Sequence, residues 1–120
     1  MTNNIKTTIQ EALETRILVV DGAMGTSIQS LDLTAEDFGG PEYEGCNEYL
    51  SLTNPNAISL IHEQYLQAGA DIIETNTFGA TSVVLAEYDL QHLTMEINLT
   101  SANLARDMVD KYSTPQRPRY

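Results

Sequence analysis

Apolar residues recur three or four positions apart over several stretches of the chain, and this spacing predicts amphipathic helices. The pattern predicts an N-terminal helix over residues 5–15 and a longer helix over about 93–112. Two shorter helical segments are expected over 26–31 and 81–88. Helices therefore account for much of the expected regular structure.

A further helix is marked by its end signals as well as by its pattern. Asn54 precedes Pro55, which is the arrangement of an N-cap followed by proline at the first helical position. Gly69 provides a C-terminal stop for the same helix. His62 lies beside its apolar stripe, either packed, exposed or acting as a ligand, and a packed or surface histidine is the commoner case.

Two short apolar runs predict strands instead. Residues 17–20 read Ile-Leu-Val-Val, and β-branched residues in an unbroken run are typical of a strand buried on both faces of a parallel sheet. Residues 71–78 resemble a second strand and its exit. Because a long connection with a helix separates the two runs, we expect a right-handed βαβ unit and an α/β fold.

The exits of these two expected strands carry polar residues. Asp21 and Gly22 follow the first run, and Thr75, Asn76 and Thr77 end the second. The carboxyl ends of parallel strands point the same way, so these residues are expected to face each other across one opening. Ligands of parallel α/β folds bind at such ends of the strands.

The side chains at this opening allow more than one role. Asp21 could bind an ammonium group, orient a donor or cap the following turn. Gly22 and Gly25 could let the backbone approach a ligand or could serve the turn alone, since they match no dinucleotide or phosphate-loop fingerprint. Glu74 would need a partner if it were buried.

Residues 32–48 form a long connection that is acidic throughout and contains no Lys or Arg. Gly39, Gly40 and Pro41 rule out one continuous helix across it. Two interpretations stay open: a solvated loop without a role, or a loop that lies over a functional opening.

Charge and cysteine content exclude several functions. Seventeen acidic residues against six basic ones give a formal net charge of −11, which disfavours nucleic acid and anionic membranes. With no apolar run long enough to span a membrane and no secretory signal pattern, a cytoplasmic protein is expected. Cys46 is the single cysteine, so this chain cannot form a multi-thiolate metal site.

Three segments, in this order and spacing, carry a family resemblance: ILVVDGAMGT at 17–26, GCNEYL at 45–50 and AGADIIETNTFGAT at 68–81. Together they resemble the start of the homocysteine S-methyltransferase domain family, and most closely its bacterial cobalamin-dependent members. The likeness extends from about residue 8 to residue 120.

The resemblance implies a fold and a domain organisation. Members of this family contain a (β/α)8 barrel, which typically takes about 250 residues. Residues 1–120 would then be a partial homocysteine-binding domain, with about two βα units after an N-terminal helix. Residues 117–120 would approach the third barrel strand, and the chain would stop before it.

The resemblance also implies an enzyme that transfers a methyl group to the thiol of homocysteine and forms methionine. Methylcobalamin would be the donor, methyltetrahydrofolate would recharge it in other modules, and zinc would activate the thiol. The family binds zinc through three cysteines in Asn-Cys and Gly-Gly-Cys-Cys segments, and neither segment occurs here. We therefore expect no metal site, no bound cofactor, no catalytic residue and no activity in this chain alone.

The resemblance assigns four substrate-binding residues. Asp21 matches an aspartate near the amino group of homocysteine, the backbone of Gly22 and Ala23 matches the turn that receives its carboxylate, and Thr75 matches a threonine of the same pocket. Glu74 does not match the family's substrate-binding glutamate, which belongs to a later segment.

Two alternatives stay open. One is a cobalamin-independent relative that uses betaine or S-methylmethionine as donor, or one fused to a folate reductase. The other is a short non-catalytic α/β protein that self-associates, because unpaired sheet edges and an uncovered apolar face favour association.

Overall fold

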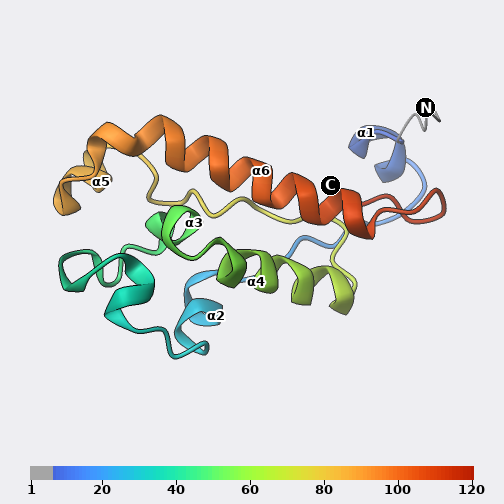
Figure 1. Ribbon diagram of the computed structural model, residues 1–120. Helices are drawn as coiled ribbons and strands as arrows, with labels where there is room; N and C mark the ends of the chain where they lie inside the picture. The colour runs from blue at the N-terminus through green and yellow to red at the C-terminus, as the bar shows by residue number, and fades with distance from the viewer. Residues whose placement is uncertain (1–6) are drawn as a thin grey trace.

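The structure, a computed structural model, describes residues 7–120, in which helices are the dominant regular elements (Figure 1). The α-helices are α1 Ile9–Leu13, α2 Gly25–Gln29, α3 Leu50–Thr53, α4 Pro55–Ala68, α5 Ser82–Leu85 and α6 Thr94–Tyr112. Short 3-10 helices lie between them: η1 Ala35–Phe38, η2 Pro41–Tyr43, η3 Asn47–Tyr49, η4 Ala86–Tyr88 and η5 Gln91–Leu93.

The expected α/β fold, with two βα units of a (β/α)8 barrel, is wrong for residues 7–120. Neither predicted run forms a strand there, and the two extended segments meet in an isolated parallel bridge between Val20 and Ile72. In this bridge Asp21 N–H donates to the Ile72 carbonyl at 2.8 Å, and Ile72 N–H donates to the Val19 carbonyl at 3.1 Å. The described part of the chain is helical, with extended connections.

The first run fails as a strand because its side chains are not covered. Ile17 is 86% exposed, and Val19 and Val20 are exposed as well, although burial on both faces was expected. A strand depends on neighbouring segments for its hydrogen bonds, whereas a helix makes them within itself. The helices therefore form here, while within residues 7–120 the backbone of residues 17–20 pairs only with the segment at residues 71 and 72.

The extended segment at residues 71–73 pairs with the segment at residues 19–21 on one side and with Tyr120 on the other. Ile73 N–H donates to the Tyr120 carbonyl and Tyr120 N–H donates to the Asp71 carbonyl, both at 2.8 Å. Residues 71–73 thus lie between the segment that ends at Asp21 and the C-terminal residue.

The predicted ends of α4 are confirmed. The Asn54 side chain accepts a hydrogen bond from Ala57 N–H at 3.4 Å, and Pro55 occupies the first helical position. Gly69 follows the helix in the left-handed conformation, with φ of 110°. These choices satisfy an N-terminal amide and end the helix without the steric cost of a Cβ atom.

Two arginines from the C-terminal segment bind the carbonyl end of α4. Arg119 Nη1 donates to the Leu66 and Ala70 carbonyls at 2.8 Å each, and Arg117 Nη2 donates to the Gly69 carbonyl at 2.7 Å. Positive charge is favourable at a helix C-terminus, where carbonyl groups lack helical partners. Arg117 and Arg119 therefore attach the segment at residues 117–120 to the C-terminal end of α4.

The other predicted helices are present with adjusted bounds. The N-terminal one is α1, which begins after Thr8, whose side chain accepts from Glu11 N–H at 3.2 Å; Ile5 lies outside the described residues. The segment 26–31 corresponds to α2, 81–88 to α5 with η4, and 93–112 to α6.

The helices α4 and α6 lie along each other, and the extended segment after α4 passes beside α6 (Figure 1). Between them, apolar side chains form a buried cluster that also includes the extended segment: Leu66, Ala70, Ile73, Ala105 and Val109. Two further clusters join α2, α3, α4 and η1, and α5 with the start of α6. The described part of the chain measures 47 × 27 × 27 Å. No helix in it is both long and apolar enough to cross a membrane.

The acidic connection is more ordered than a solvated loop. Residues 32–48 contain η1, η2 and the start of η3, and the side chains of Phe38 and Cys46 are buried in two different clusters. These two apolar side chains attach the connection to the core, and most of its acidic side chains remain outside.

Candidate functional site

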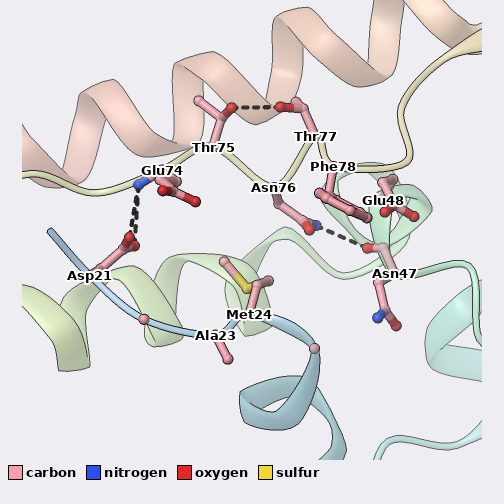
Figure 2. A pocket seen from close by; sticks show the side chains of 12 residues that line it. Asp21, Ala23, Met24, Asn47, Glu48, Glu74, Thr75, Asn76, Thr77 and Phe78 are labelled. Carbon is pink, nitrogen blue, oxygen red and sulfur yellow. Dashed lines mark hydrogen bonds between the residues drawn. The ribbon is translucent and has the colours of Figure 1, made fainter.

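A pocket of about 400 Å³ lies where the two extended segments end (Figure 2). The four predicted substrate-binding residues Asp21, Gly22, Ala23 and Thr75 all line it. The remaining lining residues come from the same two exits and from η3: Met24, Gly25, Asn47, Glu48, Glu74, Asn76, Thr77 and Phe78. The structure thus brings the predicted residues to one opening, although the segments that carry them are not strands.

Asp21 is fixed at this opening by the bridge and by its own side chain. Its N–H donates to the Ile72 carbonyl at 2.8 Å, and its carboxylate accepts from Glu74 N–H, with both oxygens at 3.2 Å. Figure 2 shows the Asp21 side chain directed at the Glu74 amide. The carboxylate therefore spans the two segments and still borders the pocket.

The surroundings of Asp21 favour its protonated form. Partial burial raises the pKa of Asp21 to about 6, and the nearby Glu74 carboxylate acts in the same direction, while the Glu74 N–H opposes the shift. A carboxylate that lacks full solvation has more to gain from a bound cation than one in open water. Such perturbed acids are common at binding sites, though structural sites perturb them as well.

The Gly22–Ala23 turn is held from behind by Tyr65 of α4. The Tyr65 hydroxyl donates to the Ala23 carbonyl at 2.8 Å, and a Cβ atom at Gly22 would lie 3.1 Å from the same hydroxyl oxygen. Glycine is needed here for the close approach of this ring, whereas a Cβ at Gly25 would meet its nearest neighbour at an ordinary 3.8 Å.

The amides of this turn are unused. Within residues 7–120, neither Gly22 N–H nor Ala23 N–H has a hydrogen-bond partner. Both residues are exposed and both line the pocket, so their amides are available to an acceptor there. Two neighbouring free N–H groups are donors of the kind that receive a carboxylate.

Thr75 lies on the opposite side of the pocket together with Thr77. Their hydroxyl oxygens are 2.7 Å apart, and Thr77 N–H donates to the Thr75 carbonyl at 2.9 Å. The Glu74 side chain is exposed, so its charge is solvated by water and needs no buried ion-pair or hydrogen-bond partner. Figure 2 shows the Thr75 and Thr77 side chains on the side of the loop that faces away from Asp21, where their hydroxyl groups pair with each other.

Two residues of η3, Asn47 and Glu48, also line the pocket, and the sequence alone assigned them no role. Both contact the segment that follows Thr75. Asn76 Nδ2 donates to the Asn47 carbonyl at 2.9 Å, and Glu48 Oε1 accepts from Gly79 N–H at 2.9 Å. These two η3 residues belong to the GCNEYL motif at 45–50, which is part of the family resemblance. The motif alone does not indicate a role for them, because their contacts with residues 76–79 depend on the tertiary fold.

The charge of the pocket has one sign. Asp21, Glu48 and Glu74 line it, and among residues 7–120 no Lys or Arg does so. This charge pattern attracts an ammonium group, while the free amides of the Gly22–Ala23 turn are the available donors for an anionic group.

The described residues do not fit a zinc site. Within 7–120, no three His, Cys, Asp or Glu side chains are grouped closely enough to hold a metal ion. Cys46 is buried in the core, and burial raises the pKa of its thiol, whereas a zinc ligand must be a thiolate.

The comparisons with known proteins identify the class. The sequence model of the family described as homocysteine S-methyltransferase matches residues 18–120, and the chain belongs to this family. Among its relatives is the methionine synthase of Mycobacterium tuberculosis (strain ATCC 25618 / H37Rv), which is 42% identical over 114 residues, or 95% of this chain. The methionine synthase of Mycobacterium leprae (strain TN) is also 42% identical over 114 residues. The chain spans about 9% of the length of these curated relatives.

Proposed function

We propose that this chain is part of a methionine synthase and contributes the binding site for the amino acid end of homocysteine. The observation that carries the proposal is the arrangement at the pocket in a member of this family: a carboxylate with a raised pKa stands beside two unused amides. Residues 1–120 are then a partial homocysteine-binding domain.

In this proposal each residue has one task. The Asp21 carboxylate binds the ammonium group, the amides of Gly22 and Ala23 bind the carboxylate, and the Thr75 hydroxyl borders the same end of the substrate. Holding both charged groups fixes the direction in which the thiol side chain leaves the pocket. These residues orient the substrate and do not take part in the methyl transfer.

The reaction of the longer protein needs groups that the described residues do not supply. Zinc would lower the pKa of the homocysteine thiol, and methylcobalamin, recharged from methyltetrahydrofolate, would provide the methyl group. We assign both groups to other parts of the protein and derive no step through them. A donor other than methylcobalamin, such as betaine or S-methylmethionine, is the alternative within the family. The proposed location is the cytoplasm.

A titration of the chain with homocysteine analogues tests the proposal. We expect L-homocysteine to shift the amide NMR signals of Gly22, Ala23 and Glu74. Removing the amino group, as in 4-mercaptobutanoate, or the carboxylate, as in 3-mercaptopropylamine, should weaken binding. If neither deletion changes the affinity, or if the signals of these three residues do not move, the pocket does not hold the amino acid end.

Asp21→Asn should weaken the binding of L-homocysteine by roughly 10- to 100-fold at pH 7.5, because it removes a charge-assisted hydrogen bond. The affinity of the unchanged protein should fall as the pH drops below about 6, where Asp21 becomes protonated. The affinity of the Asn variant should stay flat between pH 5 and 7.5. Glu87→Gln, an equal charge change at an exposed site outside the pocket, is the control.

The same substitution separates binding from stability. The pKa of Asp21 is raised from 3.8 to about 6, so its ionisation opposes folding above about pH 6 and has no such effect below about pH 4. Asp21→Asn should therefore bind less tightly while being at least as stable at pH 7 in urea unfolding. A variant that loses binding and stability together would instead indicate a structural role for Asp21.

We also propose that the isolated chain self-associates through the exposed apolar residues of segment 17–20, of which Ile17 is 86% exposed. Its mass in sedimentation equilibrium should rise with concentration, and Ile17→Lys should reduce this dependence. A mass that stays monomeric at all concentrations would contradict the proposal and with it the non-catalytic alternative, a protein that works by self-association.

A further inference from the structure

The outer rim of the pocket is a short loop that another segment fixes at two points. Thr77 and Phe78 form the middle of this loop, and Phe78 is 103% exposed although it lines the pocket. The loop has no regular structure of its own, so its position depends on contacts with η3 and α6. We refer to residues 75–79 as the rim loop.

The first fixed point is Asn76, which is buried. Its side-chain amide donates to the Asn47 carbonyl at 2.9 Å, and its own carbonyl accepts from Ser101 Oγ of α6 at 3.4 Å. Ser101 Oγ also forms a hydrogen bond with Ser51 Oγ at 2.8 Å. This end of the rim loop is therefore attached to the core between two helices.

The second fixed point is Gly79, and it depends on one side chain. Glu48 Oε1 accepts from Gly79 N–H at 2.9 Å. A Cβ atom at Gly79 would lie 2.8 Å from this oxygen and 3.2 Å from the carboxyl carbon, so the carboxylate packs against bare backbone. Both the acceptor at position 48 and the missing side chain at position 79 are needed for this contact.

We propose that Glu48 is a positioning residue, whose carboxylate holds the rim loop, with its residues Thr75, Thr77 and Phe78, at the side of the pocket opposite Asp21. This proposal rests on the proposed function for the pocket, but the contact at Gly79 can be tested without a ligand. In this assignment Glu48 binds Gly79 and does not itself bind the ammonium group, which is left to Asp21.

The first experiment uses the ligand-free chain and amide hydrogen exchange. Glu48→Ala should accelerate exchange at Gly79 by about tenfold or more, because the hydrogen bond that protects this amide is lost. Exchange within α6 should remain unchanged. Glu48→Gln should retain most of the protection, since its amide oxygen can still accept. Unchanged exchange at Gly79 in Glu48→Ala would refute the positioning contact whether or not the pocket binds homocysteine.

The second experiment measures L-homocysteine affinity by NMR titration. We expect Glu48→Ala to weaken it about five- to tenfold and Glu48→Gln to restore it to within about twofold. Equal losses in Glu48→Ala and Glu48→Gln would overturn the proposal, since they would show that the charge of Glu48 acts on the ligand. Glu44→Ala is the matched control, because it removes an exposed acid of the same connection that does not line this pocket.

A double-mutant cycle with Gly79→Ala completes the test. The added methyl group should displace the Glu48 carboxylate and break the same hydrogen bond, so Gly79→Ala should reduce affinity about as much as Glu48→Ala. The double variant should be no worse than either single one. Additive losses would mean that the two residues act independently and would contradict the proposal.

Discussion

Asp71→Ala is expected to lower the free energy of unfolding by about 2–3 kcal/mol at pH 7, the largest effect among the substitutions considered. The Asp71 side chain is 1% exposed and accepts from Arg16 Nη2 at 2.7 Å and from Val19 N–H at 2.9 Å. Arg117 Nε lies 3.6 Å away. The loss is smaller than for a fully buried ion pair, because both arginines remain partly in water.

The pH dependence provides a separate check. The hydrogen bond from Arg16 lowers the pKa of Asp71 from 3.8 to about 2, against the effect of burial. A lowered pKa in the folded state means that stability is present above about pH 4 and is lost as the pH falls towards 2. Urea unfolding followed by circular dichroism should therefore show acid destabilisation in the unchanged protein that is reduced in Asp71→Asn.

Asp110→Ala is the control for this prediction. Asp110 pairs with Arg106 at 3.7 Å on the surface of α6, and both side chains are more than 60% exposed at 62% and 64%. Such exposed pairs contribute little, so a change of about 0.5 kcal/mol or less is expected. If Asp71→Ala costs no more than this control, the buried carboxylate does not hold segment 17–21 against residue 71.

Between pH 7 and pH 5 the protein is expected to lose about 2 kcal/mol of its free energy of unfolding because of His62, and His62→Leu should remove this loss. His62 is 0% exposed in α4, and neither of its ring nitrogens has a hydrogen-bond partner among residues 7–120. Burial lowers the pKa of His62 from 6.5 to about 4, so the unfolded chain takes up a proton that the folded chain resists. Stability is therefore present above about pH 6.5 and declines as the pH falls towards 4.

The measurement is urea unfolding at pH 7, 6 and 5 for the protein and the variant. Leucine has a similar volume and no polar atoms, so the variant should be at least as stable at pH 7 and clearly more stable at pH 5. His92→Gln, which removes an exposed histidine, is the matched control. An undiminished decline in His62→Leu would show that another group causes it.

Several features were predictable because their causes are local. The N-cap at Asn54, Pro55 at the first turn and Gly69 at the end determine the bounds of α4 within a few neighbouring residues. The packed environment of His62 was one of the open alternatives, and the structure selects it. The convergence of Asp21 and Thr75 on one pocket was also expected, but their roles in substrate binding stay predictions.

The strands were the main error, and the cause is not local. The run at 17–20 has strand-forming residues, yet a strand also needs neighbours on its edges and cover on its faces. Here residues 17–20 are bridged to one segment, and Ile17, Val19 and Val20 are exposed, so strand propensity is not sufficient. The prediction that the two segment ends meet at one pocket was nevertheless correct, because one bridge is enough to place Asp21 beside Glu74.

By itself the sequence determined the helices, the family and the residues of the two exits, because capping, apolar spacing and motifs act over short distances along the chain. Only the tertiary structure decided which distant groups meet. It buries Asp71 against Arg16, and it brings Glu48 to the Gly79 amide. The reason is physical: these contacts join residues 55 and 31 positions apart, and no local pattern specifies such pairs.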